Sequence, residues 1–154
     1  MTAPRVTIRG AAPSDLAAIA ALQTDSFSDP WDAASIARLA ALPGAVLLVA
    51  VAGSGTLCGY ALGHAIGEVA ELTSIAVAPE ARRAGLGGRL LAMFEGVAAS
   101  LGAERVVLDV AADNNPACRM YAARGYIVAG ERPGYYRRGR VAPVDAVVMA
   151  RGLN

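Results

Sequence analysis

The chain has 154 residues, of which 55% are apolar, and a formal net charge of +1. This length predicts a single domain over residues 1–154, because domains commonly run to about 100 to 200 residues. Although the mean hydropathy is +0.43, the longest apolar run, residues 45–52, is too short for the roughly 18 residues of a membrane span. We therefore expect no membrane association, and an N-terminus without the apolar core of a signal peptide predicts a cytoplasmic protein.

All basic charge comes from arginine, because the sequence contains no lysine. Mechanisms that need a phosphate-loop lysine or a Schiff-base lysine are therefore excluded. The single histidine, His64, and two cysteines, Cys58 and Cys118, lack zinc-site spacing, so we predict no metal and assign these residues no role. The net charge of +1 argues against nonspecific nucleic-acid binding, which needs a concentrated basic surface. The chemistry must come from carboxylates, tyrosines and backbone amides.

In chain order, the N-terminal half is predicted to form a strand, two helices and three strands. A short alternating strand at residues 6–9 precedes a helix from Leu16, which Ser14 or Asp15 is expected to cap. A second helix at residues 32–42 is expected to end at a Pro-Gly pair. The three strands, joined by glycine-containing turns, are predicted at residues 45–52, 57–66 and 69–77.

The C-terminal half alternates helices and strands. An apolar stripe through Leu90 and Phe94 predicts a helix that Gly102 ends, followed by a strand at residues 105–110. Asn115 and Pro116 have the cap-then-proline order that opens a short helix. The last strands are predicted at residues 126–131 and 145–150, separated by a loop with arginines and tyrosines. The alternation implies parallel pairing in a mixed sheet of α/β or α+β class, with about seven strands and about four helices.

Residues 82–88, Arg-Arg-Ala-Gly-Leu-Gly-Gly, lie between a predicted strand end and a helix start. Glycines let the backbone approach a ligand, and the free amides and dipole of a helix N-terminus favour a phosphate or pyrophosphate. A dinucleotide fingerprint would need a glycine at Leu90, and a phosphate loop would need a lysine. The segment predicts an anion-binding loop, with a plain glycine-rich turn as the alternative.

This loop resembles the pyrophosphate loop, Q/R-x-x-G-x-G/A, of the GNAT family of acetyl-CoA-dependent N-acetyltransferases. The resemblance extends to residues 72–79 before the loop and to residues 114, 117, 121 and 125–126 after it. It implies a GNAT-like fold and an enzyme that uses acetyl-CoA as cosubstrate. The cofactor-binding residues that it implies are Ile75, Ala76, Val77, Arg82, Arg83, Ala84, Gly85, Leu86, Gly87, Gly88 and Asn114.

More narrowly, the chain looks like the ribosomal-protein alanine N-acetyltransferases, the RimI-type branch of the family. Four local features carry this likeness: residues 29–31, Glu71, the pair at 135–136 and residues 145–149. The likeness implies that Trp31, Tyr135 and Tyr136 bind the acceptor. Core packing for Trp31 and an ordinary surface role for the tyrosines remain the alternatives. If the arginines at 132, 137, 138 and 140 line an acceptor groove, they would repel the basic tails typical of ribosomal proteins.

The resemblance also implies catalytic roles for three residues. Asp109 stands where the family has its general-base glutamate and is one methylene shorter, whereas Tyr121 matches the proton donor to the departing thiolate. Glu71 has apolar neighbours, so partial burial could raise its pKa and help it act through water. Structural roles for all three residues remain open. For the oxyanion we expect a backbone amide near Val77.

The sequence therefore predicts direct acetyl transfer, in a ternary complex, from acetyl-CoA to the N-terminal α-amine of a protein or peptide. An α-amine with a pKa of about 7.7 to 8.0 needs only a weak base. Two alternatives stay open: a GNAT enzyme for a small-molecule amine, and a non-catalytic acetyl-CoA-binding module, which the aspartate at 109 keeps possible. The partner is an acceptor protein N-terminus or a small amine, and no oligomeric state is predicted.

Overall fold

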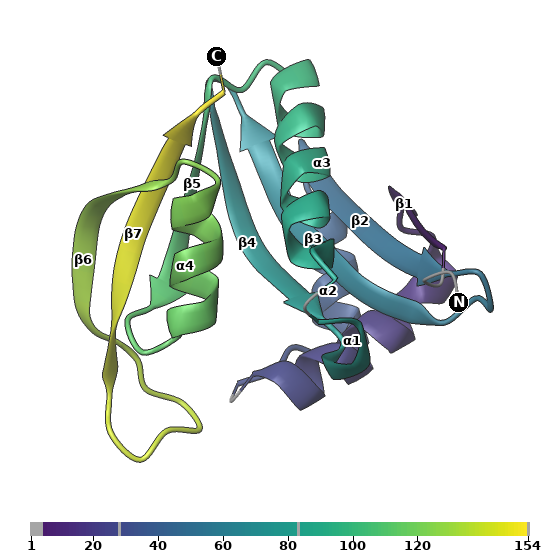
Figure 1. The fold of residues 1–154 in the computed structure, drawn as a ribbon, viewed down its shortest axis with the longest axis horizontal. Coiled ribbons are helices and arrows are strands. Elements are labelled where there is room, and N and C mark those ends of the chain that lie inside the picture. The colour runs from purple at the N-terminus through teal and green to yellow at the C-terminus, as the bar shows by residue number, and fades with distance from the viewer. Residues whose placement is uncertain (1–4, 28, 83, 154) are drawn as a thin grey trace.

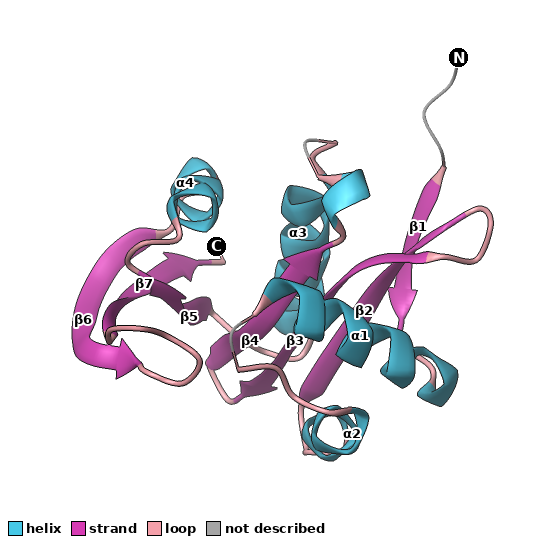
Figure 2. Ribbon diagram, turned by 90° about the horizontal axis from the view of Figure 1, so that it is seen from below, coloured by secondary structure: helices cyan, strands magenta, loops and turns pink. Residues whose placement is uncertain are grey.

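The computed structural model describes residues 5–27, 29–82 and 84–153. These residues form one seven-stranded mixed sheet in the order β1-β2-β3-β4-β5-β7-β6, with α1 and α2 on one face and α3 and α4 on the other (Figures 1 and 2). The elements are β1 (Val6–Gly10), α1 (Leu16–Ser26), α2 (Ala33–Ala40), β2 (Ala45–Ala52), β3 (Leu57–Ile66), β4 (Val69–Val77), α3 (Leu86–Ser100), β5 (Arg105–Ala111), α4 (Asn115–Ala123), β6 (Ile127–Tyr136) and β7 (Val144–Gly152). The predicted mixed sheet, with four helices, is confirmed as an α+β fold. Across the described ranges, no helix combines the length and apolar character needed to cross a membrane.

The helix caps differ from the sequence prediction. Asp15 precedes α1 but does not cap it, because its carboxylate accepts from the Ala12 N–H at 2.7 Å and pairs with Arg9 at 2.8 Å. The cap of α4 is Asn114 rather than Asn115, since the Asn114 side chain accepts from the backbone N–H three residues later. Asp15 stands at the N-cap position of α1 but makes no capping bond, because its carboxylate is already bound to Ala12 and Arg9. The predicted cap Asn115 is wrong by one residue, because Asn114 makes the capping bond of α4.

The C-terminal strands also pair differently from the predicted parallel tail. Parallel pairing is confirmed between β4 and β5, but β7 inserts between β5 and β6 and is antiparallel to both. The β6–β7 connection therefore folds back as a hairpin. Because β6 continues to residue 136, Tyr135 and Tyr136 lie in a strand and not in the predicted loop.

Strands β4 and β5 separate along their length, as Figure 1 shows. They pair only over Val69–Leu72 and Arg105–Leu108. Just beyond, the β3–β4 register shifts so that Thr73 is left between two paired positions, which is the geometry of a β-bulge. Since a bulge bends its strand, β4 turns away from β5 at this point. The second half of β4 thus faces an opening in the sheet.

Gly63, on β3 opposite the bulge, makes this geometry possible. A Cβ atom there would lie only 2.6 Å from the Phe94 ring of α3 and would overlap the carbonyl oxygen of Glu71. The glycine therefore lets α3 pack onto the sheet where β4 bends. Phe94 itself is fully buried in the larger of two hydrophobic clusters, which also includes Leu90 and Leu91.

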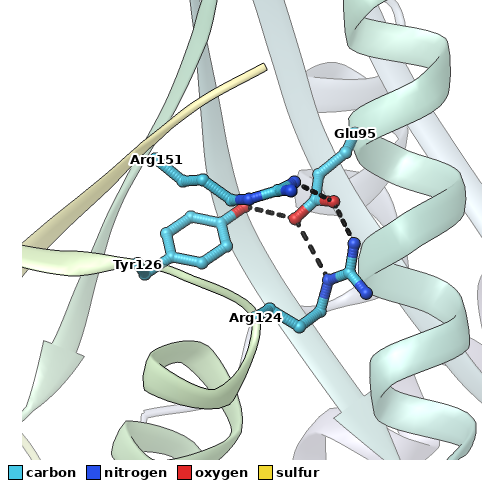
Figure 3. A network of polar contacts seen from close by, with 4 residues as sticks. All are labelled: Glu95, Arg124, Tyr126 and Arg151. Atoms are coloured by element: carbon cyan, nitrogen blue, oxygen red, sulfur yellow. Dashed lines mark hydrogen bonds and ion pairs between the residues drawn. The ribbon is translucent and has the colours of Figure 1, made fainter. Parts of the chain in front are cut away.

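A buried ionic network holds the two sides of the opening together (Figure 3). Glu95 of α3, which is 5% exposed, accepts from Tyr126 at 2.9 Å, from Arg151 of β7 at 2.7 Å and from Arg124, which caps α4. Burial, and then the hydrogen bond to this carboxylate, raises the pKa of Tyr126, so the phenol remains a donor. Three donors around one carboxylate are what a buried charge requires.

Glu95→Gln is expected to destabilise the fold by about 3 kcal/mol, because removing one member of a buried ionic network leaves the other charges uncompensated. Urea unfolding followed by circular dichroism measures the change. Glu104→Gln, at an exposed position, is the control and should stay within about 0.5 kcal/mol of wild type. A Glu95 variant as stable as the control would show that the network adds no net stability.

Candidate active site

The glycine-rich loop ends in an exposed helix N-terminus. Gly85 occupies the N-cap position of α3 with φ +74°, a left-handed conformation that favours glycine. The first helical hydrogen bond runs from Arg89 N–H to the Gly85 carbonyl, so the amides of residues 86–88 have no partner within the helix. No described side chain caps them. These amides and the helix dipole make a site that suits an anion.

The other loop residues have distinct surroundings. Arg82 donates from Nε to the Val77 carbonyl at 3.0 Å, which holds its guanidinium beside the end of β4. Ala84 is exposed next to Gly85. The predicted cofactor residue Arg83 lies outside the described residues.

The two glycines inside the first helical turn also differ. A Cβ on Gly87 would lie 2.8 Å from the Met120 sulfur of α4, whereas a Cβ on Gly88 would meet no atom within 4 Å. At Gly87, the Met120 side chain of α4 would therefore have to move to accept a larger residue, even without a ligand. Gly88 remains open space beside the free amides.

The second half of β4 offers a free backbone edge. Ala78 N–H donates to the Cys58 carbonyl on the β3 side. The N–H and C=O groups of successive strand residues point to opposite sides. Those of Ala76 therefore point toward β3, whereas those of Ile75 and Val77 point away from β3, toward the opening. Ala76 is also buried in the cluster around α1. Ile75 and Val77 are thus the two of the three predicted strand residues whose main chain is placed to meet a ligand.

Tyr121 of α4 is 5% exposed and packs against the Tyr126 ring, with the ring centroids 5.7 Å apart. Burial raises the pKa of this phenol, and the nearby Tyr136 adds to the effect. Its hydroxyl donates to no described residue, which leaves its proton available. Asn114 lies exposed at the start of the same helix, with its carboxamide oxygen used as the cap.

The two candidate bases lie on the sheet face opposite α3 and α4, each close to a nitrogen-bearing side chain. Asp109 of β5 accepts from Arg132 Nε of β6 at 3.1 Å. Glu71 of β4 lies 3.9 Å from His64 Nε2 of β3 and is 50% exposed, so the partial burial expected from its sequence neighbours is wrong. The hydrogen bond to Asp109 is the main cause that raises the Arg132 pKa, and Glu71 contributes last. Arg132 therefore lies near both carboxylates.

The predicted acceptor residues lie on two segments. Trp31, half-buried, is in the α1–α2 connection and packs against the cluster around α1. Tyr135 and Tyr136 form a T-shaped pair 5.1 Å apart, and Arg132 stacks over Tyr135 at 5.6 Å. The same arginine binds Asp109, so the tyrosine pair lies beside one of the two candidate bases.

Part of the arginine cluster is neutralised. Arg132 pairs with Asp109, and Arg140 pairs with Asp113 at 3.1 Å while stacking over Tyr136. Arg137 donates to the Gly134 carbonyl. The repulsion of a basic acceptor is therefore weaker than the arginine count suggests. In the described part of the chain, no three metal-ligating side chains lie close enough to hold a metal ion.

Sequence reasoning missed two site features. Arg132 is 23 residues from Asp109, and only the pairing of β5, β7 and β6 brings them together. Gln23 of α1, which bonds the Trp31 N–H at 2.9 Å, has no motif around it. Neither contact leaves a signal in residue spacing, because each depends on tertiary structure.

The chain is similar to named acetyltransferases in sequence. It is 35% identical over 152 residues to the N-alpha-acetyltransferase RimI of Mycobacterium tuberculosis (strain ATCC 25618 / H37Rv), covering 95% of this chain and 92% of that protein. It is also 34% identical over 145 residues to the uncharacterised protein ML0378 of Mycobacterium leprae (strain TN), covering 90% of this chain. In that second case the chain spans only 38% of the relative's length.

Solved structures agree with this likeness. The ribosomal-protein-S18-alanine N-acetyltransferase from Escherichia coli superposes with a TM-score of 0.88 at 25% identity, over 97% of this chain and 95% of that one. A GNAT superfamily phosphinothricin acetyltransferase from Sinorhizobium meliloti, in complex with acetyl-CoA, superposes with a TM-score of 0.82 at 25% identity, over 97% and 89%. The model of the acetyltransferase (GNAT) family matches residues 16–126. The chain belongs to the GNAT family of acetyltransferases.

Proposed function

We propose that this N-acetyltransferase acetylates the N-terminal α-amine of a protein or peptide. The observation that carries the proposal is Arg132, which binds the candidate base Asp109 and stacks over Tyr135, so the tyrosine end of β6 lies beside that base. In the proposal, an extended peptide end lies between this end of β6 and the α1–α2 connection, a path that we call the acceptor lane. The similarity to an N-alpha-acetyltransferase over 95% of the chain supports the same assignment.

The carboxylates favour a peptide over a polycationic small amine. Asp109 and Asp113 are each paired with an arginine, so neither offers a free negative charge to a polyamine. A small-molecule acceptor nevertheless remains the alternative, because the phosphinothricin acetyltransferase and the Escherichia coli ribosomal-protein-S18-alanine N-acetyltransferase are both 25% identical to this chain. The identity of the acceptor therefore decides between the two functions.

The residues of the opening fit acetyl-CoA, which supplies an activated acetyl thioester when bound. The free amides of residues 86–88 and the Arg82 guanidinium would hold the pyrophosphate. The main-chain groups of Ile75 would pair with the pantetheine arm along β4, whereas the Val77 carbonyl already accepts from Arg82. The Val77 amide would also lie near the developing oxyanion, where a fixed donor stabilises charge.

The proton leaves the amine on the face that carries Asp109 and Glu71. Asp109 binds Arg132 through Oδ1, so Oδ2 is the atom that would take the proton, directly or through water. Glu71 is the second candidate, and its half-exposed carboxylate suits a water-mediated path. Tyr121 would donate a hydrogen bond to the departing thiolate. Full transfer from the phenol is uphill, because a phenol pKa near 10 exceeds a thiol pKa near 8.5, and burial raises the Tyr121 pKa further.

Gly88→Asp is expected to weaken acetyl-CoA binding by about tenfold or more, because it places a negative charge beside amides that would hold the pyrophosphate. Gly88→Ala is the matched control, since an added Cβ meets no atom within 4 Å. Isothermal titration calorimetry with acetyl-CoA measures both. Equal acetyl-CoA affinity in the two variants would show that the pyrophosphate does not bind at this helix start.

The proton donor and the base should differ in pH dependence. Tyr121→Phe is expected to lower kcat by about a hundredfold, the usual scale for general acid-base groups, at every pH between about 6 and 9, because the raised phenol pKa keeps the proton on Tyr121. Loss of the true base should lower the rate most at low pH, where neutral amine is scarce, and rising pH should partly restore it. Rate profiles of Tyr121→Phe, Asp109→Asn and Glu71→Gln measure this.

A Tyr121→Phe enzyme with wild-type kcat would reduce the tyrosine to a packing residue. If the Asp109 and Glu71 variants both keep the wild-type profile, neither carboxylate is the base.

Peptides with a free N-terminal alanine should be acetylated faster than the same peptides blocked at the N-terminus and carrying lysine. An α-amine loses its proton near pH 7.7 to 8.0, whereas a lysine amine is protonated up to about pH 10.4, so the short base Asp109 suits the former. A panel of free and blocked peptides, with small amines alongside, measures kcat/KM under saturating acetyl-CoA. If small amines or blocked lysine peptides are the better acceptors, the N-terminal assignment fails.

A further inference from the structure

The described part of the α1–α2 connection, residues 27 and 29–32, is held to α1 by one buried side chain. Gln23, near the end of α1, is only 2% exposed. Its Oε1 accepts a hydrogen bond from the Trp31 N–H at 2.9 Å. Because this bond joins residues eight apart, it closes the connection into a loop and determines where Trp31 lies.

The same glutamine reaches the sheet. Tyr60 of β3 is fully buried, and its hydroxyl is 2.6 Å from the Ser74 hydroxyl of β4. Burial raises the pKa of Tyr60 to about 12, and the neighbouring Ser74 and Gln23 side chains partly offset this rise. Ser74 occupies the first paired position after the bulge, opposite Leu62. The Trp31 backbone, Gln23, Tyr60 and Ser74 are therefore neighbours, with hydrogen bonds between Trp31 and Gln23 and between Tyr60 and Ser74.

This end of α1 also has unused hydrogen-bonding capacity. Gln23 Nε2 and Ser26 Oγ are buried, and neither has a partner among the described residues. The two residues are three apart in α1 and so lie on the same side of the helix. Buried polar atoms in native proteins are normally satisfied, by protein, water or ligand. These two atoms thus keep hydrogen-bonding capacity for a further polar group next to the loop that carries Trp31.

We propose that Gln23 is a positioning residue that fixes the α1–α2 connection against β4 and thereby sets which first residue of the acceptor fits. The inference rests on the proposed function, in which this connection forms one side of the acceptor lane. Gln23 itself does not touch the reacting atoms. It acts through the position of Trp31 relative to Ser74.

The test compares Gln23→Met, which keeps the length but removes both polar atoms, with Gln23→Glu, whose neutral form burial favours and which still accepts from Trp31. Thr24→Ala is the control, since this exposed neighbour bonds only within its own helix. Each enzyme is assayed with peptides that differ only in the first residue, alanine or leucine. Acetyl-CoA KM is measured alongside.

Gln23→Met is expected to lower the alanine-to-leucine ratio of kcat/KM by about tenfold, the scale of discrimination by a methylene-sized pocket, through the acceptor KM. The acetyl-CoA KM should stay within about twofold, while Gln23→Glu and Thr24→Ala should keep the wild-type ratio. A folded Gln23→Met enzyme with an unchanged ratio overturns the proposal. So does a Gln23→Glu enzyme that loses the ratio as fully as Gln23→Met.

Tyr60→Phe carries the test if Gln23→Met does not fold, because it removes only the hydroxyl that reaches Ser74. It should lower the ratio in the same direction, and an unchanged ratio there also overturns the proposal. If the wild-type enzyme accepts small amines instead of peptides, the proposed function fails first. The role of Gln23 is then tested by measuring the KM for that amine and the KM for acetyl-CoA in the Gln23→Met enzyme. A KM for the amine equal to that of the wild-type enzyme overturns the role.

Discussion

The separation of β4 from β5 is the constraint on which the candidate site depends. The strands part after four paired residues because Thr73 is left unpaired and bends β4. Gly63 allows the bend, since any side chain there would collide with Phe94 and the β4 backbone. The opening exposes main-chain groups of Ile75 and Val77 that a continuous sheet would consume. Unpaired strand groups are a liability in a folded protein unless something covers them, and in the proposed function the cosubstrate arm covers them.

Glu95 and Asp109 have different surroundings, which suit one to a structural role and the other to proton transfer. Glu95 is buried and accepts from three different side chains, so its lone pairs are used and its charge is compensated. Asp109 is partly exposed and accepts from Arg132 through one oxygen only. A second oxygen thus remains for a proton. Residue type alone would treat these two acids alike, whereas the number of donors around each assigns Glu95 to the fold and leaves Asp109 available for transfer.

The three central strands were predictable because the composition of each segment decides them. The strands at residues 45–52, 57–66 and 69–77 are apolar runs between glycine or proline breaks, and the structure has the same bounds. The predicted burial of Glu71 was wrong because its apolar neighbours in sequence, Ala70 and Leu72, point to the opposite face of the strand. The insertion of β7 and the Arg132–Asp109 pair could not be predicted, since both depend on contacts between distant residues. The catalytic assignments remain predictions for the same reason.

The glycines of the loop before α3 and of its first turn serve different structural purposes. From sequence, the glycines of this loop were interpreted as room for a ligand. In the structure, Gly85 adopts a left-handed backbone conformation that favours glycine, and Gly87 lies against the Met120 side chain. Met120 immediately precedes Tyr121 in α4. The Met120 side chain of α4 thus packs over Gly87, which places the helix that carries the proposed proton donor beside the helix start that would hold the pyrophosphate. A larger residue at Gly87 would require the Met120 side chain to move, so the surroundings of this glycine are set by packing within the protein as well as by any ligand.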